Sequence, residues 1–240
     1  MKTREVIYEG KAKKMYRTDD ENVLFVEYLD QVTALNGARK DEMIGKAELN
    51  NGISSFIFAW LQKQGIESHF LSKEGKTEQL VKKLEMIPLE IVLRNVAAGS
   101  FSKRFGIAQG TAIANPIIEF YYKADELDDP FINDDHVHYF SIATKEELAT
   151  IRQMTLAINE KLQELFDLAY LKLVDFKIEV GRTSEGTIVL ADEISPDTCR
   201  LWDKTTNESL DKDVYRKKTG DLLTVYREVA KRLATIQEDK

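Results

Sequence analysis

The segment from Leu173 to Asp197 begins with charged and apolar residues in alternation. Asp175, Lys177 and Glu179 occupy every second position, and the residues between them are phenylalanine, isoleucine and valine. A period of two places the charges on one face of a β-strand and the apolar side chains on the other. The segment therefore predicts a strand with one buried face, and its charged face is either exposed to solvent or turned toward a ligand.

A second strand is expected directly after this one. Ser184 and Gly186 lie in a turn-forming loop, and the apolar run 187–194 completes the sequence pattern of a β-hairpin. If the loop holds an even number of residues, odd positions on the first strand share a face with even positions on the second. With that register, Asp192 joins the charged face and Glu193 points away from it.

Carboxylates that face each other across two strands repel unless a cation lies between them. Mg²⁺ is a natural candidate, because it is bound by one or two carboxylates and otherwise by water and phosphate oxygens. Lys177 in the same group suits a phosphate better than a bare metal site. The hairpin therefore suggests a nucleotide site, with a solvated sheet face as the alternative.

Composition limits the classes of protein that the chain can represent. Its 240 residues can form one large domain or two lobes, and 43% hydrophobic with 31% charged residues is typical of a soluble globular protein. We expect neither a membrane segment, since no apolar run approaches the roughly 18 residues needed, nor a secretory signal. The single cysteine, Cys199, fits a reducing cytoplasm. A net charge of −7 argues against a nucleic-acid binder.

Strands and helices are both expected along the chain. The strand-like segments are residues 5–10, 13–18, 22–29, 78–88, 89–96 and 117–122. The amphipathic helices are residues 46–64, 144–168 and 212–236, and Thr144 with Glu147 forms a capping box for the second. A short helix within 97–106 would be capped by Ser100 or Ser102. This mixture predicts an α+β protein with two unequal lobes and a site in the cleft between them.

Two other segments could bind anions. Gly10, with lysines on both sides, lies in a turn whose backbone amides could cover phosphates, although basic hairpin turns are common. Arg94 precedes a Gly-Ser turn that opens a helix, and both features attract anions. The alternative for Arg94 is a surface position or an ion pair.

The segment after the hairpin leaves two interpretations open. Arg200 could meet a phosphate group, or it could form a structural ion pair with Asp203. Cys199 has no neighbouring histidine in the sequence, so nucleophilic catalysis is not expected. The three histidines, His69, His136 and His138, do not form a zinc pattern with this one cysteine, and the last two are expected at the surface of a loop or strand.

Four motifs in this order span the chain: YEGKAK at 8–13, VKKLEMIPLEIVLRN-V-AAGS at 81–100, LVDFKIEVG at 173–181, and LADEISPD-TC-RLWD at 190–203. Together they closely resemble the bacterial SAICAR synthetases, the phosphoribosylaminoimidazole-succinocarboxamide synthases of de novo purine biosynthesis. The resemblance implies ATP-dependent joining of L-aspartate to CAIR, the carboxylated aminoimidazole ribonucleotide, through an acyl phosphate. The products are SAICAR, ADP and phosphate.

The resemblance also implies a two-lobe α+β fold related to that of protein kinases, with antiparallel sheets, flanking helices and ATP between the lobes. Residues 1–86 would form the mostly β lobe with the glycine-rich turn, and residues 87–240 the larger lobe with the CAIR and metal sites. ATP and Mg²⁺ are the implied cofactors, CAIR and L-aspartate the small-molecule partners, and a homo-oligomer, most often a dimer, the assembly.

Site residues follow from the same resemblance. The ATP phosphates would be covered by Gly10, Lys11, Ala12 and Lys13, and adenine held by Leu24, Lys82, Leu84 and Met86. The metal ligands would be Glu179 and Asp192. The CAIR phosphate would be bound by Arg94, Ser100 and Arg200, with Asp175 and Lys177 nearer the ribose and the reacting carboxylate. The side chains assigned to the reaction itself are Lys177, Asp175 and Lys13. Charged positions of the site without a fixed role are Glu90, Lys123 and Lys212.

The segment from Thr33 to Lys46 resembles the mobile loop of the family over CAIR and aspartate. Asn36 departs from the family pattern, in which many members carry an acidic residue, so it is assigned no direct role. Two other functions remain as alternatives, a small-molecule kinase and a nucleotide-sensing module without turnover. Dependence of phosphate release on aspartate would separate the ligase from the kinase. A binding module would be expected to have lost the metal pair, whereas Glu179 and Asp192 are both present.

Overall fold

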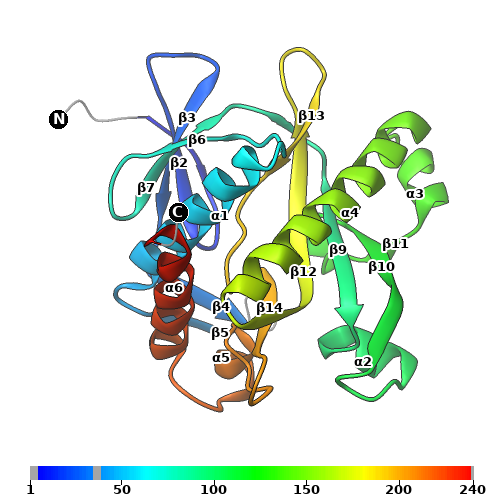
Figure 1. Cartoon of the computed structure of the whole chain (residues 1–240). Coiled ribbons are helices and arrows are strands. Elements are labelled where there is room, and N and C mark those ends of the chain that lie inside the picture. Colours follow the sequence, from blue (N-terminus) through cyan, green and yellow to red (C-terminus); the bar gives the residue numbers. More distant parts are fainter. Residues whose placement is uncertain (1–4, 35–38, 239–240) are drawn as a thin grey trace.

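A computed structural model describes residues 5–34 and 39–238. Asn36 lies outside the described residues, so the expectation about this position stays a prediction. Two antiparallel sheets, flanked by helices, form the body of the protein (Figure 1). Within the described ranges no helix is long and apolar enough to cross a bilayer. The mixed architecture agrees with the α+β class expected from the sequence.

The first sheet is built mainly from the N-terminal third of the chain. Its order is β1-β2-β3-β7-β6, with β1 at Val6–Glu9, β2 at Lys13–Arg17, β3 at Val23–Tyr28, β7 at Glu78–Lys82 and β6 at Phe70–Lys73. Helix α1 (Lys46–Lys63) packs on this sheet and contributes Ala47 to a cluster with Val26, Tyr28 and Val81. The glycine-rich turn lies between β1 and β2, at an open end of the sheet.

The second sheet is larger and strongly twisted. Its main path is β11 (Phe131–Ile132), β10 (Ala112–Tyr122), β9 (Leu89–Val96), β12 (Leu171–Arg182) and β13 (Ile188–Ala191). Two further strands also pair with β12, namely β14 (Cys199–Asp203) and β8 (Glu85–Met86). The long charged strand expected from the sequence is therefore the central strand of this sheet, with neighbours on both sides. We propose that the lobes divide after Met86, shortly after the chain has passed from β7 of the first sheet to β8 of the second.

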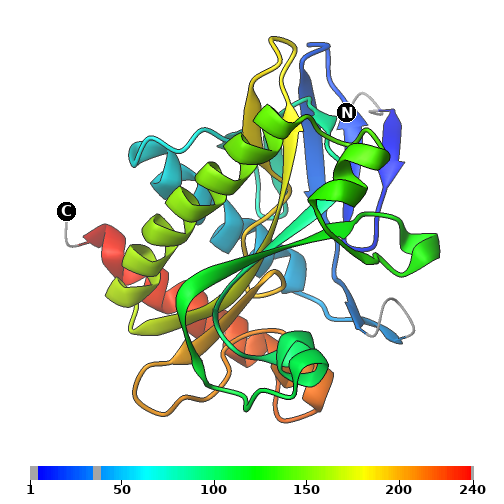
Figure 2. The same ribbon diagram turned by 90° about the vertical axis from the view of Figure 1, so that its right-hand side faces the viewer.

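Helix α4 (Lys145–Leu168) covers one face of the second sheet (Figure 2). Its apolar stripe includes Ile151, Ile158 and Leu162, which are fully buried in one core with residues of α1, β9 and β12. Phe176 and Ile178 point into the same core from β12, so the apolar half of the alternation is the buried face, as expected. The charged half then faces the opposite side of the sheet.

The remaining elements lie at the edges. A small hairpin joins β4 (Gln31–Ala34) to β5 (Arg39–Glu42), and α6 (Leu222–Glu238) lies beside α1 (Figure 1). The short helices are α2 (Gly99–Phe105), α3 (Asp134–Tyr139), α5 (Asp213–Lys217) and a 3-10 turn at Asp125–Leu127.

Three expectations about these elements were wrong. The tail is not one helix, because Lys218 adopts a left-handed conformation (φ 56°) and separates α5 from α6. Neither serine caps α2, since its N-cap is Ala98 and no side chain caps it. His136 and His138 belong to helix α3, in which Asn133 and His136 form a capping box.

The capping box of α4 allows a test of the fold. Thr144 accepts a hydrogen bond from the Glu147 amide (3.2 Å), and the Thr144 amide donates to the Glu147 carboxylate (2.8 Å). Thr144→Ala should lower the free energy of unfolding by about 1 kcal/mol, measured by urea denaturation. Thr150→Ala on the exposed face of the same helix is the control, with a change below about 0.5 kcal/mol. Equal effects of the two substitutions would contradict the importance of the cap.

Candidate active site

A cleft of about 1230 Å³ is lined by strands of both sheets. Each residue that the sequence assigned to the nucleotide, the metal or the substrate lines this cleft, from Gly10 in the first sheet to Lys212 near the C-terminus. Segments that are far apart in the sequence therefore meet in one place. Their individual roles depend on geometry, which differs in several details from the expectations.

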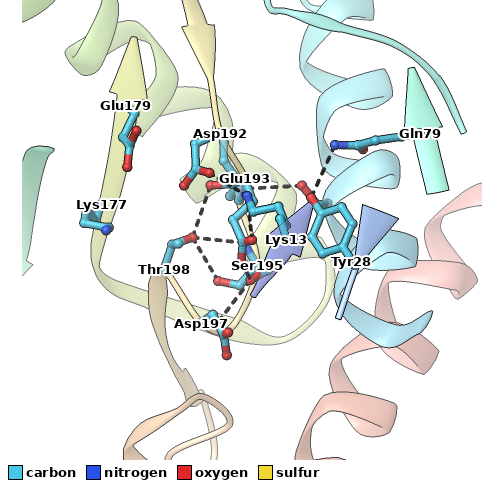
Figure 3. A network of polar contacts seen from close by, with 12 residues as sticks. Lys13, Tyr28, Gln79, Lys177, Glu179, Asp192, Glu193, Ser195, Asp197 and Thr198 are labelled. Atoms are coloured by element: carbon cyan, nitrogen blue, oxygen red, sulfur yellow. Dashed lines mark hydrogen bonds and ion pairs between the residues drawn. The ribbon is translucent and has the colours of Figure 1, made fainter. Parts of the chain in front are cut away.

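The hairpin brings its carboxylates together in an unexpected way. Strands β12 and β13 pair with Glu179 opposite Ala191, so odd positions face odd positions and the expected register was wrong. Asp192 follows directly after β13 and has a left-handed backbone (φ 62°), which breaks the alternation. The carboxylates of Glu179 and Asp192 consequently face the same part of the cleft (Figure 3). A single backbone dihedral, and not the strand register, produces this convergence.

Lys13 connects the first sheet to this hairpin. Its ammonium lies 2.5 Å from Asp192 and 2.9 Å from Glu193, so Glu193 does not point away from the cleft as expected. Burial alone would lower the pKa of Lys13, but the two carboxylates outweigh this and hold the pKa well above its usual value. Lys13 therefore remains an ammonium ion at neutral pH.

Two further charge pairs lie in the cleft. Lys123 lies 2.5 Å from the buried carboxylate of Glu179, and Lys177 contacts Glu90. Burial and the charge of Asp192 raise the pKa of Glu179. Burial would raise the pKa of Asp192 as well, yet the nearby lysines, first of all Lys13, lower it below its usual range. The two carboxylates thus differ in proton affinity although they lie in the same group.

These carboxylates suit a hard cation. Within the part of the chain that the structure describes, no group of three or more His, Cys, Asp or Glu side chains could hold a metal ion. Glu179 and Asp192 can supply two carboxylate groups, and the remaining ligands would come from water and phosphate. Mg²⁺ commonly binds in this way beside nucleotides, so the donor set fits this ion.

A second cluster is organised by Asp175. This carboxylate accepts hydrogen bonds from Arg94 (2.9 Å) and from Arg200 (2.8 Å) and is itself buried. Arg94 also donates to Glu119, and its remaining nitrogen lies 3.4 Å from the Ser100 hydroxyl. Two arginines and a serine are thereby held in fixed positions at the wall of the cleft. Such a group can bind a phosphate or carboxylate.

The alternative pairing of Arg200 with Asp203 was wrong. Arg200 bonds to Asp213 (3.2 Å) in addition to Asp175, and Asp203 bonds to Arg232 (2.8 Å). Gly99 explains how the guanidinium comes so close to the α2 turn, because a Cβ at this position would lie 2.4 Å from Arg200.

The cleft has an apolar end between the sheets. Leu24, Leu84 and Met86, which were assigned to adenine, line it together with Val26 and Val81, which were not. Val26 lies two positions after Leu24 on the expected strand, so the strand period could have identified it. Val81 instead lies opposite Leu24 on the neighbouring strand, which the sequence does not reveal. The segment that carries Leu84 lies directly on β12, where a Cβ on Gly181 would approach Leu84 Cβ to 2.8 Å.

Cys199 is buried, and burial raises the pKa of its thiol. A neutral, enclosed thiol is a poor nucleophile, in agreement with the expectation from the sequence. No role was expected for Asp197 from the sequence. Its carboxylate contacts Lys46, Lys212 and Tyr226 and lines the cleft.

The fold and this cleft define an α+β protein with a carboxylate pair and an arginine cluster in a cleft between two antiparallel sheets. Residues 6–233 match the family model described as SAICAR synthetase. The phosphoribosylaminoimidazole-succinocarboxamide synthase of Enterococcus faecalis is 57% identical, over 98% of this chain and 99% of the relative. That of Bacillus subtilis is 55% identical, over 97% and 96%. The chain belongs to the SAICAR synthetase family.

Solved structures agree with this assignment. The phosphoribosylaminoimidazole-succinocarboxamide synthase from Ehrlichia chaffeensis superposes with a TM-score of 0.94 at 49% identity, covering 96% of this chain and 98% of that one. A SAICAR synthetase in complex with ADP superposes with a TM-score of 0.92 at 46% identity, covering 95% and 97%. The family similarity therefore extends over nearly the whole fold.

The pH dependence of stability can test whether His69 is buried in the wall of the cleft. Burial, together with the nearby positive charge of Lys13, lowers the pKa of His69 to about 4. An unfolded histidine titrates near pH 6.5, so the unfolded chain binds more protons between about pH 6.5 and 4. The free energy of unfolding should therefore fall as the pH falls through this window, by at most about 3 kcal/mol.

His69→Gln should remove this contribution, which urea denaturation at about pH 7 and about pH 4.5 would measure. Phe70→Leu, a core substitution next in sequence, is the control and should lower stability by similar amounts at both pH values. If the wild type and His69→Gln lost equal stability between the two pH values, His69 would not be the source of the effect.

Proposed function

We propose that this chain catalyses the ATP-dependent joining of L-aspartate to CAIR, with SAICAR, ADP and phosphate as products. The supporting observation is that the residues assigned to ATP, metal and CAIR line one cleft in a chain that matches the SAICAR synthetase family along its length. A structural neighbour described in complex with ADP supports the nucleotide part of the assignment.

The chemistry requires activation of a carboxylate. The CAIR carboxylate is a poor electrophile, so the γ-phosphoryl group of ATP is transferred to one of its oxygens and ADP leaves. The neutral α-amine of aspartate then attacks the acyl carbon, the C–O bond to phosphate breaks, and the amide forms with loss of a proton from nitrogen. Positioning and neutralisation of charge supply most of the acceleration of such a phosphoryl transfer.

The side chains of the cleft fit these requirements. Glu179 and Asp192 would hold Mg²⁺, which when bound neutralises phosphate charge. Lys13 would contact the phosphates of ATP from the glycine-rich turn. Lys177 also stays charged, because Glu90 and Glu179 raise its pKa although burial opposes them. Neither lysine is therefore suited to take the proton from the amine, and both act as fixed positive charges.

Binding of the acceptor substrate is assigned to the second cluster. Arg94, Ser100 and Arg200 would bind the CAIR phosphate, and Asp175 would hold the two arginines in position for it. The apolar end of the cleft at Leu24, Leu84 and Met86 would receive adenine, with Lys82 at its edge. With these assignments, ATP and CAIR would lie at opposite ends of the charged strand.

We also propose a homo-oligomer, with a dimer favoured, and a cytoplasmic location. Both proposals rest on the resemblance to the family, and the enclosed free thiol of Cys199 is compatible with a reducing compartment. The net charge of −7 supports small-molecule partners in preference to nucleic acid.

A phosphate-release assay tests the reaction directly. With ATP, CAIR and L-aspartate all present, we expect steady release of inorganic phosphate and formation of SAICAR. Omission of any one substrate should reduce the steady rate to background, because the acyl phosphate is consumed only by the amine. Continued ADP production without aspartate would indicate a kinase, and no turnover with all three would indicate a binding module.

The carboxylate pair provides a second test. Asp192→Asn and Glu179→Gln should each lower kcat by about 10²-fold or more, since each removes a negative charge from the expected metal ligands. Glu185→Gln, in the exposed loop of the same hairpin, is the matched control and should retain the wild-type rate. A folded Asp192→Asn variant with a near wild-type kcat would contradict the metal assignment.

A further inference from the structure

Asp197 lies in a buried cluster that the proposed mechanism does not use. Its carboxylate accepts a hydrogen bond from Lys46 Nζ at 2.7 Å and another from the Tyr226 hydroxyl. Lys212 Nζ approaches the same carboxylate to only 3.5 Å. Lys46 of α1, Tyr226 of α6 and Lys212, which precedes α5, thus meet at one carboxylate. These three residues and Asp197 form the Asp197 cluster.

The charges of the Asp197 cluster do not balance. Two lysines share one carboxylate, so one positive charge is left over. The side chain of Lys46 is 1% exposed and that of Lys212 is 13% exposed, and only Lys212 lines the cleft. Because Lys46 lies closer to Asp197, the unbalanced charge is presented to the cleft by Lys212.

A second positive charge also acts on Lys212. Arg216 lines the cleft with it and is paired with Asp213 at 2.8 Å. Burial, and then repulsion by Lys46 and Arg216, lower the pKa of Lys212 although Asp197 and Glu193 oppose them. An anion bound at Lys212 would relieve this repulsion.

Stability alone does not explain the buried position of Lys46. It is the first residue of α1, where a positive charge is opposed by the helix dipole. The N-terminus of α1 is already satisfied by Asp30, which accepts hydrogen bonds from the amides of Gly45 (3.0 Å) and Ala47 (2.8 Å). A buried ion pair can often be replaced by apolar residues without loss of stability. We therefore expect the Asp197 cluster to have a function in addition to stabilising the fold.

We propose that Lys46 is a positioning residue that occupies Asp197 and so leaves the Lys212 ammonium free to bind an anionic group of an acceptor substrate. The group is a carboxylate or phosphate, carried by either CAIR or L-aspartate. This inference rests on the proposed function, because it assigns a task within the same cleft. Without Lys46, the Lys212 ammonium would close onto Asp197 and withdraw from the substrate.

The test uses three variants of the full chain in the phosphate-release assay. Lys46→Met should raise the KM of CAIR or of aspartate by about 10-fold or more, the typical cost of a lost hydrogen bond to a charged group, and leave the KM of ATP unchanged. The double variant Lys46→Met/Asp197→Asn should restore that KM to within about 3-fold of wild type, since Lys212 then has no carboxylate to close onto. Lys63→Met, at the exposed end of the same helix, is the control and should resemble wild type.

A second measurement does not depend on turnover. Labelling of Lys212 by an amine-reactive ester, followed by peptide mass spectrometry, should slow in Lys46→Met and recover in the double variant. If Lys46→Met does not fold, Lys46→Gln takes its place, because it also removes the positive charge that balances Asp197, and the same shifts are expected.

The outcomes separate this inference from the proposed function. An aspartate-independent wild-type enzyme would refute the ligase activity, and the labelling would then decide the Lys46–Lys212 relation alone. Equal rises in all three KM values, or a double variant no better than Lys46→Met, would assign Lys46 a merely structural role and overturn the inference. Unchanged labelling of Lys212 in Lys46→Met would do so as well.

Discussion

The contact of Lys13 with Asp192 and Glu193 joins the two sheets of the protein. Lys13 comes from β2 of the first sheet, and both carboxylates follow β13 of the second. Charges taken out of water are stable only when they are paired, so this contact fixes the distance between the glycine-rich turn and the hairpin. The closed end of the cleft, and the place where a triphosphate would meet a metal ion, depend on it.

Local patterns in the sequence predicted much of the fold. The capping box of Thr144 and the stripe of α1 specify helices through contacts within a few residues, and the alternation at Phe176 specifies a buried strand face. The register of the hairpin was not predictable in this way, because it depends on the loop 183–187, and neither was the left-handed backbone of Asp192. No proline marks the break between α5 and α6 at Lys218, so the sequence did not predict this break either.

The candidate site was likewise only partly predictable from the sequence. The resemblance to the family identified residues that line the cleft, although several of them, such as Gly10, Ser100 and Lys212, lie outside the strands. Partners could not be inferred, since they come from distant segments: Lys46 and Asp197 are 151 positions apart. Ser100 was expected to cap α2, whereas its hydroxyl lies near Arg94, so tertiary contacts outweighed the local preference. Pairing of this kind also allows an acidic chain to offer positive charge locally.

The single strand β12 carries Asp175, Lys177 and Glu179 on one face, and it is paired along its length with four other strands. A strand rises about 3.3 Å per residue, so Asp175 and Glu179 are separated by about 13 Å of rigid backbone. The strand therefore sets the distance between the arginine cluster and the carboxylates that we propose to bind a metal ion. An acceptor would then be selected by its length. A molecule too short to reach from the arginine cluster to these carboxylates could bind at either end without being aligned for phosphoryl transfer.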